Sequence, residues 1–119
     1  MRVAEVRIDL SKIMNEYVKE IDDKVDHAAD QVGKETVTML KQTSPKKTGR
    51  YAKGWRVKKE DRQRYVYNAV KPQLTHLLEH GHVKRGGGRV RAYVHIKPAE
   101  EAATKRFIEL TSEAIKGVE

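Results

Sequence analysis

The stretch Ser11–Gln42, SKIMNEYVKEIDDKVDHAADQVGKETVTMLKQ, decides the fold because its apolar residues return every three or four positions. Such spacing gathers them on one face of a helix and leaves the charged residues on the other face. Asp9 or Ser11 can cap the start of this helix, and Pro45 forces Ser44 out of helical geometry. The sequence therefore predicts a long surface helix that docks through an apolar stripe. The stripe consists of Ile13, Tyr17, Ile21, Val25, Ala28, Val32 and Met39, with Thr36 in the one gap.

Three later segments are predicted to be strands. The first and third alternate apolar and polar residues, as on a strand with one buried face, and the second is rich in aromatic and β-branched residues. The first two segments flank a polar turn at 60–63 and predict an antiparallel pair, while the third alternates most regularly. The three predicted strands are Trp55–Lys58, Tyr65–Val70 and Val90–Ile96, and a short strand is also expected at Val3–Ile8.

Two further helices are predicted between and after these strands. Leu74, Leu77 and Leu78 share one face of a short helix that Gly81 can close in a left-handed cap. Pro98 suits the first turn of a longer helix, which runs to about residue 116. Between them, the glycines of His82–Arg89 favour a loop.

The order of these elements predicts one α+β domain over residues 1–119. We expect an antiparallel sheet of three to four strands packed against a long N-terminal helix and a C-terminal helix. A short helix and a Gly-rich loop are inserted, and the loops at about 43–53 and 82–90 are expected to be mobile. The helices would cover one face of the sheet. The other face would present Arg56, Lys58, Arg91, His95 and Lys97.

Composition excludes several classes of protein. The 119 residues include no cysteine, which excludes disulfides, thiol catalysis and zinc fingers. No apolar run reaches the roughly 20 residues that a membrane span needs, and the start lacks the features of a secretory signal. We therefore expect a soluble protein that is made inside a cell and has no membrane partner.

The net charge of +8 is unevenly distributed along the chain. Residues 1–41 carry seven Lys and Arg against nine Asp and Glu, residues 42–97 carry fifteen against three, and residues 98–119 carry three against five. A block this basic attracts polyanions or an acidic protein surface, or serves as a solvated surface.

Catalytic and metal-binding patterns are poorly represented. His76 and His80 share a helix face and His82 follows, but the one nearby carboxylate, Glu79, points away from them. Ser44 has no histidine close by in sequence, and the glycines at 86–88 lack the Gly-Lys-Ser/Thr ending of a phosphate loop. These patterns therefore predict no metal site and no cofactor.

Nucleic-acid binding is better supported, because basic residues between Lys46 and Arg64 are interleaved with Tyr51, Trp55 and Tyr65. Such a pattern can hold phosphates and stack bases, unless Trp55 and Tyr65 point into the core. A metal-independent small nuclease that uses Arg, Lys and Tyr is a further alternative, although spacing nominates no acid–base pair.

Three segments, in order, resemble the neck, head-tail joining or tail-completion proteins of long-tailed double-stranded DNA bacteriophages and prophages. They are TSPKKTGRYAKGW at 43–55, LTHLLEHGH at 74–82, and GGRV at 87–90 with HIKPAE at 95–100. Val94 departs from the pattern, since relatives often carry proline there. The motif residues are Pro45, Thr48, Gly49, Trp55, Leu78, Glu79, Gly81, His82 and Pro98, and the resemblance implies structural roles for them.

The resemblance implies a non-enzymatic virion protein, made in the cytoplasm of the bacterial host, that joins or completes the tail at the head-tail junction. Its partners would be other connector and tail proteins, copies of itself in a homo-oligomeric ring, and packaged DNA through non-specific contacts. A basic nucleic-acid-binding protein or a metal-independent nuclease is the alternative. The residues expected to contact a partner or DNA are Arg50, Lys53, Arg56, Lys58, Lys84, Arg85, Arg89 and Arg91.

Overall fold

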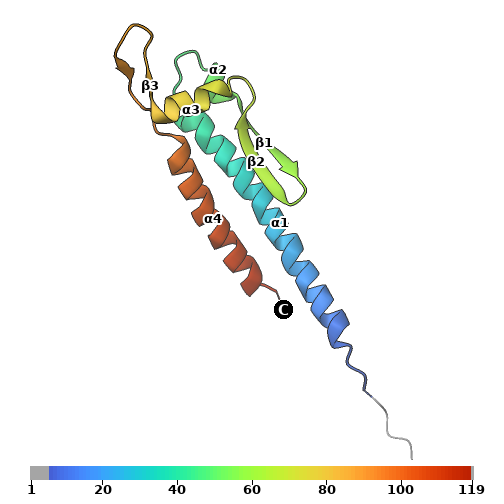
Figure 1. Cartoon of the computed structure of the whole chain (residues 1–119). Coiled ribbons are helices and arrows are strands. Elements are labelled where there is room, and N and C mark those ends of the chain that lie inside the picture. The colour runs from blue at the N-terminus through green and yellow to red at the C-terminus, as the bar shows by residue number, and fades with distance from the viewer. Residues whose placement is uncertain (1–5, 119) are drawn as a thin grey trace, which may run out of the picture.

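The computed structural model describes residues 6–118 and has an α+β fold, with two long helices and two small hairpins (Figure 1). Both the long helices and the antiparallel pairing agree with the fold class predicted from the sequence. The elements, in chain order, are α1 (Leu10–Thr43), α2 (Arg50–Lys53), β1 (Trp55–Glu60), β2 (Gln63–Asn68), α3 (Gln73–His80), β3 (His82–Val83), β4 (Arg89–Val90) and α4 (Ile96–Lys116).

Helix α1 is the longest element of the structure. Its 34 residues span about 51 Å at 1.5 Å per residue. The carboxylate of Asp9 caps its start by accepting a hydrogen bond from the Lys12 amide at 2.9 Å, and the chain turns extended at Ser44, ahead of Pro45. The predicted long helix is thus confirmed. The strand expected at Val3–Ile8 is wrong for residues 6–8, which lie in no strand, and its first residues lie outside the described part of the chain.

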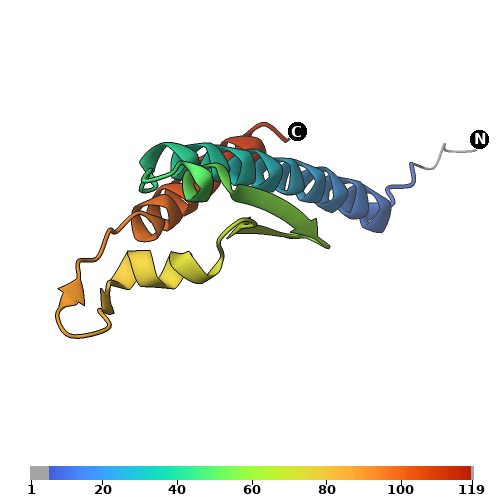
Figure 2. The ribbon, with the colours of Figure 1, turned by 90° about the horizontal axis from the view of Figure 1, so that it is seen from above.

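Strands β1 and β2 form an antiparallel hairpin in which Trp55 lies opposite Asn68 and Glu60 lies opposite Gln63. This hairpin and α4 both pack on α1, and α4 runs antiparallel to the C-terminal half of α1 (Figures 1 and 2). Strands β3 and β4 pair with each other in a separate hairpin. The expected single sheet of three to four strands is therefore wrong.

The segment Val90–Ile96 accounts for this difference. Only its first residue belongs to a strand, and α4 already begins at Ile96, two residues before Pro98. The Tyr93 amide donates to the carbonyl of Leu78 at 2.6 Å, so the segment follows the end of α3 instead of a strand edge. The alternating apolar and polar residues of this segment therefore belong to a connecting loop, near whose end one residue, His95, is buried.

The core is small and lies at one end of the molecule, where the C-terminal part of α1 meets α2, β1 and the start of α4. Its buried members are Leu40, Tyr51, Trp55 and Ala99.

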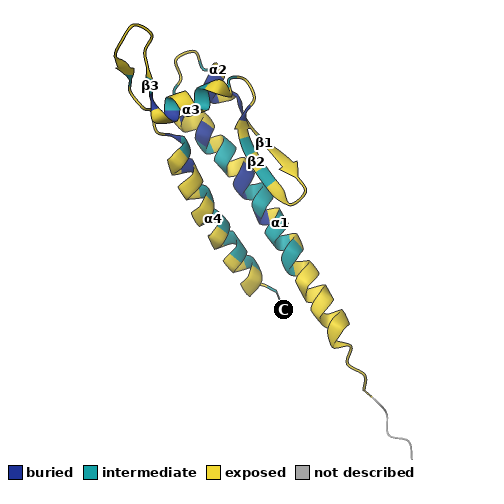
Figure 3. Ribbon diagram, in the orientation of Figure 1, coloured by how far each residue is buried: buried dark blue, intermediate teal, exposed yellow. Residues whose placement is uncertain are grey.

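The accessible surface of the chain is 9492 Å². A compact monomer of this mass exposes only about 6600 Å². The N-terminal part of α1 extends past the end of α4 and is exposed on all sides (Figure 3). Among residues 6–118, no helix is long and apolar enough to cross a membrane.

Candidate interaction surface

A buried polar network joins the sequence motifs at the core. The Tyr51 hydroxyl lies 2.7 Å from Nε2 of His95, and Nδ1 of His95 lies 2.7 Å from the carbonyl oxygen of Tyr93. Because a carbonyl oxygen only accepts, Nδ1 of His95 carries the proton, and Nε2 of a neutral imidazole accepts from Tyr51. Burial, together with the nearby carboxylate of Glu79, raises the pKa of Tyr51 to about 12. The network therefore keeps the tyrosine in its neutral, donating form.

Glu79 of α3 caps the start of α4 from outside that helix. Its carboxylate accepts hydrogen bonds from the amides of His95 and Ile96, each at 2.8 Å, and of Lys97 at 3.0 Å. Burial by itself would raise the pKa of Glu79, but the hydrogen bonds from the three backbone amides lower it below its usual value. A negative charge at the positive end of a helix is stabilising. Glu79 thus fixes the direction in which α4 leaves the core.

Two further side chains close the network. The indole of Trp55 donates to Oγ of Ser44 at 2.8 Å. The side-chain amide of Asn68 donates to the backbone carbonyl of Tyr51 at 2.7 Å. Trp55 is buried, which agrees with the alternative in which this side chain points into the core instead of stacking on bases. Tyr65, which that alternative also placed in the core, is 42% exposed.

Two motif glycines adopt positive φ. Gly49 precedes α2 with φ 80°, and Gly81 follows α3 with φ 74° and ψ 175°. The Gly81 conformation lies outside the left-handed helical region, so the expected left-handed cap is wrong. A Cβ at Gly81 would approach the carbonyl oxygen of Val90 to 2.6 Å, so this glycine permits the close return of β4.

The remaining motif residues lie around the same end of the molecule. Pro45 and Leu78 are half-buried, while Thr48 and Pro98 are exposed. The hydroxyl of Thr48 accepts from the Arg50 amide at 3.4 Å. His82 is half-buried, and its Nδ1 atom has no hydrogen-bond partner in the described part of the chain.

The histidines on α3 lie together without a ligand set. The rings of His76 and His80 are 4.7 Å apart between centroids. Within residues 6–118, no group of three His, Asp or Glu side chains is placed to hold a metal ion. Glu79, which the sequence placed off this face, binds the start of α4 instead.

The basic block of the sequence divides into two parts in the structure. The first part is on the hairpin of β1 and β2, where cations pair with acidic residues of α1. Arg64 contacts Asp26 at 2.8 Å and Asp30 at 2.6 Å, and Lys59 contacts Asp26 at 3.1 Å. Hydrogen bonds from Arg64 and then from Lys59 lower the pKa of Asp26. These charges attach the hairpin to α1.

The second part, which we call the basic end, comprises residues 44–54 and 69–97, around α2, α3 and the hairpin of β3 and β4 (Figure 1). It holds ten Lys and Arg and one acidic residue, Glu79, which is buried. None of the ten cations forms an ion pair with a carboxylate in the described chain. The cations are Lys46, Lys47, Arg50, Lys53, Lys71, Lys84, Arg85, Arg89, Arg91 and Lys97.

All eight residues predicted to contact a partner or DNA are exposed. Six of them belong to the basic end: Arg50, Lys53, Lys84, Arg85, Arg89 and Arg91. The other two, Arg56 and Lys58, lie on β1, where the Lys58 ammonium is 5.8 Å from the centroid of the Tyr65 ring. The expected single basic sheet face is wrong, because His95 is buried in the core and Lys97 lies on α4.

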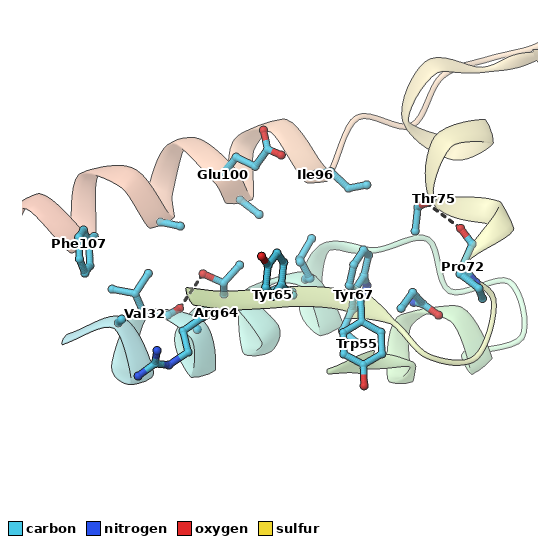
Figure 4. Close-up of a pocket in the computed structure, with 18 residues that line it drawn as sticks. Val32, Trp55, Arg64, Tyr65, Tyr67, Pro72, Thr75, Ile96, Glu100 and Phe107 are labelled. Carbon is cyan, nitrogen blue, oxygen red and sulfur yellow. Dashed lines mark hydrogen bonds between the residues drawn. The ribbon is translucent and has the colours of Figure 1, made fainter. Parts of the chain in front are cut away.

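Sequence reasoning missed an apolar groove of about 660 Å³ between α4 and the edge strand β2 (Figure 4). Tyr65 and Tyr67 lie along one wall, and Ile96 and Phe107 along the other. Helix α1 forms the floor. The groove exists because the hairpin and α4 each pack on α1 without closing on each other. The signal in the sequence was the pair Tyr65 and Tyr67, two large side chains of β2 that remain 42% exposed.

A protein-family model matches most of the chain. The HK97-gp10-like family model, described as "Bacteriophage HK97-gp10, putative tail-component", matches residues 8–114. Neither the curated proteins nor the solved structures contain a significant match to the chain.

Proposed function

The chain belongs to the HK97-gp10-like family, whose members are described as bacteriophage tail components, and on that premise we propose that it acts at the head-tail junction. The protein is a structural phage component in this proposal, not an enzyme. It joins or completes the tail by assembling as a homo-oligomeric ring with connector and tail proteins.

The observation that carries the proposal is the separation of charge along the molecule. Ten cations and one acidic residue gather at the basic end, whereas α1 carries seven acidic residues and five lysines along its length. A ring subunit needs two unlike surfaces to meet unlike neighbours, and complementary charge speeds and orients such contacts. The basic end supplies one of these surfaces.

The buried network supports a structural role for the motif residues. His95, Tyr51 and Glu79 have the side chains of an acid–base site, but all three are buried and engaged in holding α2, α3 and α4 together. Substrate has no access to them in this arrangement. A nuclease would need its acid and base at the surface of the basic end.

Contact with packaged DNA is the second part of the proposal, and the cations of the basic end favour it. If these side chains face DNA, they bind phosphates and are indifferent to sequence. Binding then weakens steeply with salt, because each neutralised phosphate releases counterions.

The deciding experiment is electron microscopy of phage particles after deletion of the gene, with complementation from a plasmid. We expect separate filled heads and tails in the deletion strain and joined particles on complementation. Complementation with Arg85→Ala/Arg89→Ala is expected to leave heads and tails apart. Complementation with Lys12→Ala/Lys19→Ala, which removes the same charge from the far end of α1, is the matched control and is expected to restore joining. Normal infectious particles from the deletion strain would refute the proposal.

A further inference from the structure

The N-terminal part of α1 carries an apolar stripe that no part of the described chain covers. Leu10 is 71% exposed, Met14 is 60% exposed and Val18 is 48% exposed. On the same face, further along α1, Ala28 and Val32 are buried. We call residues 10–21 the arm, because α4 ends beside Lys24 and leaves them uncovered.

The opposite side of the arm is charged. At 100° per residue, Lys12, Glu16 and Lys19 lie about half a turn away from Met14. An apolar stripe with a charged reverse face is the pattern of a helix that docks in a groove, with anchors at i, i+4, i+7 and i+11. Leu10, Met14, Tyr17 and Ile21 occupy this spacing.

The groove between α4 and β2 has the shape and chemistry to accept such a helix. Its wall on α4 runs from Ile96 to Phe107, which spans about 16 Å, the same length as Leu10 to Ile21. Small residues line the groove at Ala29, Gly33 and Ala103, so a helix can approach closely.

The arm cannot reach the groove of its own chain. Met14 and Val32 lie on one continuous helix, 18 residues and about 27 Å apart, and Val32 lines the groove. The arm of one copy and the groove of another are therefore the two partners. Each copy has one arm and one groove, so the same contact can repeat from copy to copy.

We propose that the arm of one copy of this chain docks in the groove of the next copy, with Leu10, Met14, Tyr17 and Ile21 as anchors and Val18 on the same face. The contact joins two different surfaces and so is heterologous, the type that generates rings when the rotation closes. It deepens the proposed function, because it names the surfaces through which the proposed ring would form.

Disulfide cross-linking tests the contact directly, because the native chain has no cysteine. We expect the double variant Val18→Cys/Ala103→Cys of the purified full chain to form a ladder of cross-linked oligomers on mild oxidation. The matched control is Lys19→Cys/Ala103→Cys, in which the arm cysteine lies one residue away on the charged face. A ladder that is absent from Val18→Cys/Ala103→Cys, or equally strong in the control, would overturn the proposal. Equal cross-linking by Val18→Cys alone would indicate that arms pack on arms, and would also overturn it.

Sedimentation provides a second test. Met14→Lys is expected to weaken self-association at least about tenfold, since it removes one large apolar anchor. Because Met14 is exposed in the single chain, the Met14→Lys variant is expected to keep the thermal stability of the native chain at low concentration. Unchanged self-association of Met14→Lys refutes the arm contact.

The two proposals fail separately. Phage particles whose junction needs this protein but tolerates Met14→Lys would leave the junction role intact and refute the arm contact. Cross-linking at Val18 and Ala103 in the purified chain, with normal particles from the deletion strain, would support the contact and refute the junction role.

Discussion

Glu79 offers the sharpest test of how this fold is held together. Within residues 6–118, its carboxylate is the only acceptor for the amides of His95, Ile96 and Lys97 at the start of α4. Losing a helix cap costs about 0.5–2 kcal/mol, and a hydrogen bond to a charged group contributes about 1.5–3 kcal/mol. Glu79→Ala removes a shared acceptor of three amides, so we expect a loss of about 2–4 kcal/mol in the free energy of unfolding.

Glu79→Gln is expected to cost less, about 1–2 kcal/mol at pH 7, because an amide oxygen still accepts but carries no charge. The matched control is Glu101→Gln, an exposed residue in the first turns of α4, and it is expected to change stability by less than about 0.5 kcal/mol. Urea unfolding followed by circular dichroism measures all three variants. For Glu79→Ala, the thermal midpoint should fall by roughly 10 °C.

The dependence of stability on pH separates the contribution of the Glu79 charge from the contribution of its packing. The pKa of Glu79 is lowered in the folded chain, so its contribution is present above the ordinary value of 4.5 and is lost as the pH falls through the lowered value. The difference between the native chain and Glu79→Gln should therefore be largest near neutral pH and shrink on acidification. A difference that is absent at pH 7, or that grows on acidification, would refute the capping role.

Three further predictions concern other parts of the molecule. Gly81→Ala should cost about 2 kcal/mol or more in unfolding experiments, because of its positive φ and its approach to β4, whereas Gly87→Ala, with positive φ in open space, should cost only about 1 kcal/mol. Arg64→Met should raise the pKa values of Asp26 and Asp30 in an NMR titration and speed amide exchange in β2; unchanged values would contradict the pairing. The pair Arg85→Ala/Arg89→Ala should reduce the log–log salt slope of DNA binding by about two, as measured by fluorescence anisotropy, if both residues contact phosphates.

The parts of the fold that could be predicted are those governed by local periodicity. Helix α1 repeats its apolar spacing over many turns, and the hairpin of β1 and β2 is bounded by a clear polar turn, so neighbours along the chain determine both. The segment Val90–Ile96 misled the prediction because alternation reports which side chains are buried, not which backbone groups pair. There, burial of His95 comes from Tyr51 and Glu79, and α4 starts where those contacts end.

The functional surfaces were only partly predictable, for the same reason. Exposure of the basic residues follows from their charge, but the division between the basic end and the paired cations depends on which residues α1 brings opposite β2. Glu79 carried no local capping signal, since the amides it binds lie 16 to 18 residues further along the chain. The groove required three elements to be placed in space, and no stretch of sequence encodes it alone.

The uninterrupted length of α1 has a consequence for how this protein can vary. The helix connects the arm to the core with no intervening loop, so an insertion within residues 21–28 changes both the reach of the arm and the direction that its stripe faces. Seven added residues lengthen it by about 10 Å and rotate the stripe by only about 20°, whereas five rotate it by about 140°. Working variants of this protein should therefore differ in this segment by lengths near whole multiples of seven, or of eleven, while loops elsewhere vary freely. The length of α1 thus sets how far the arm reaches, and its helical repeat sets the direction in which the stripe faces.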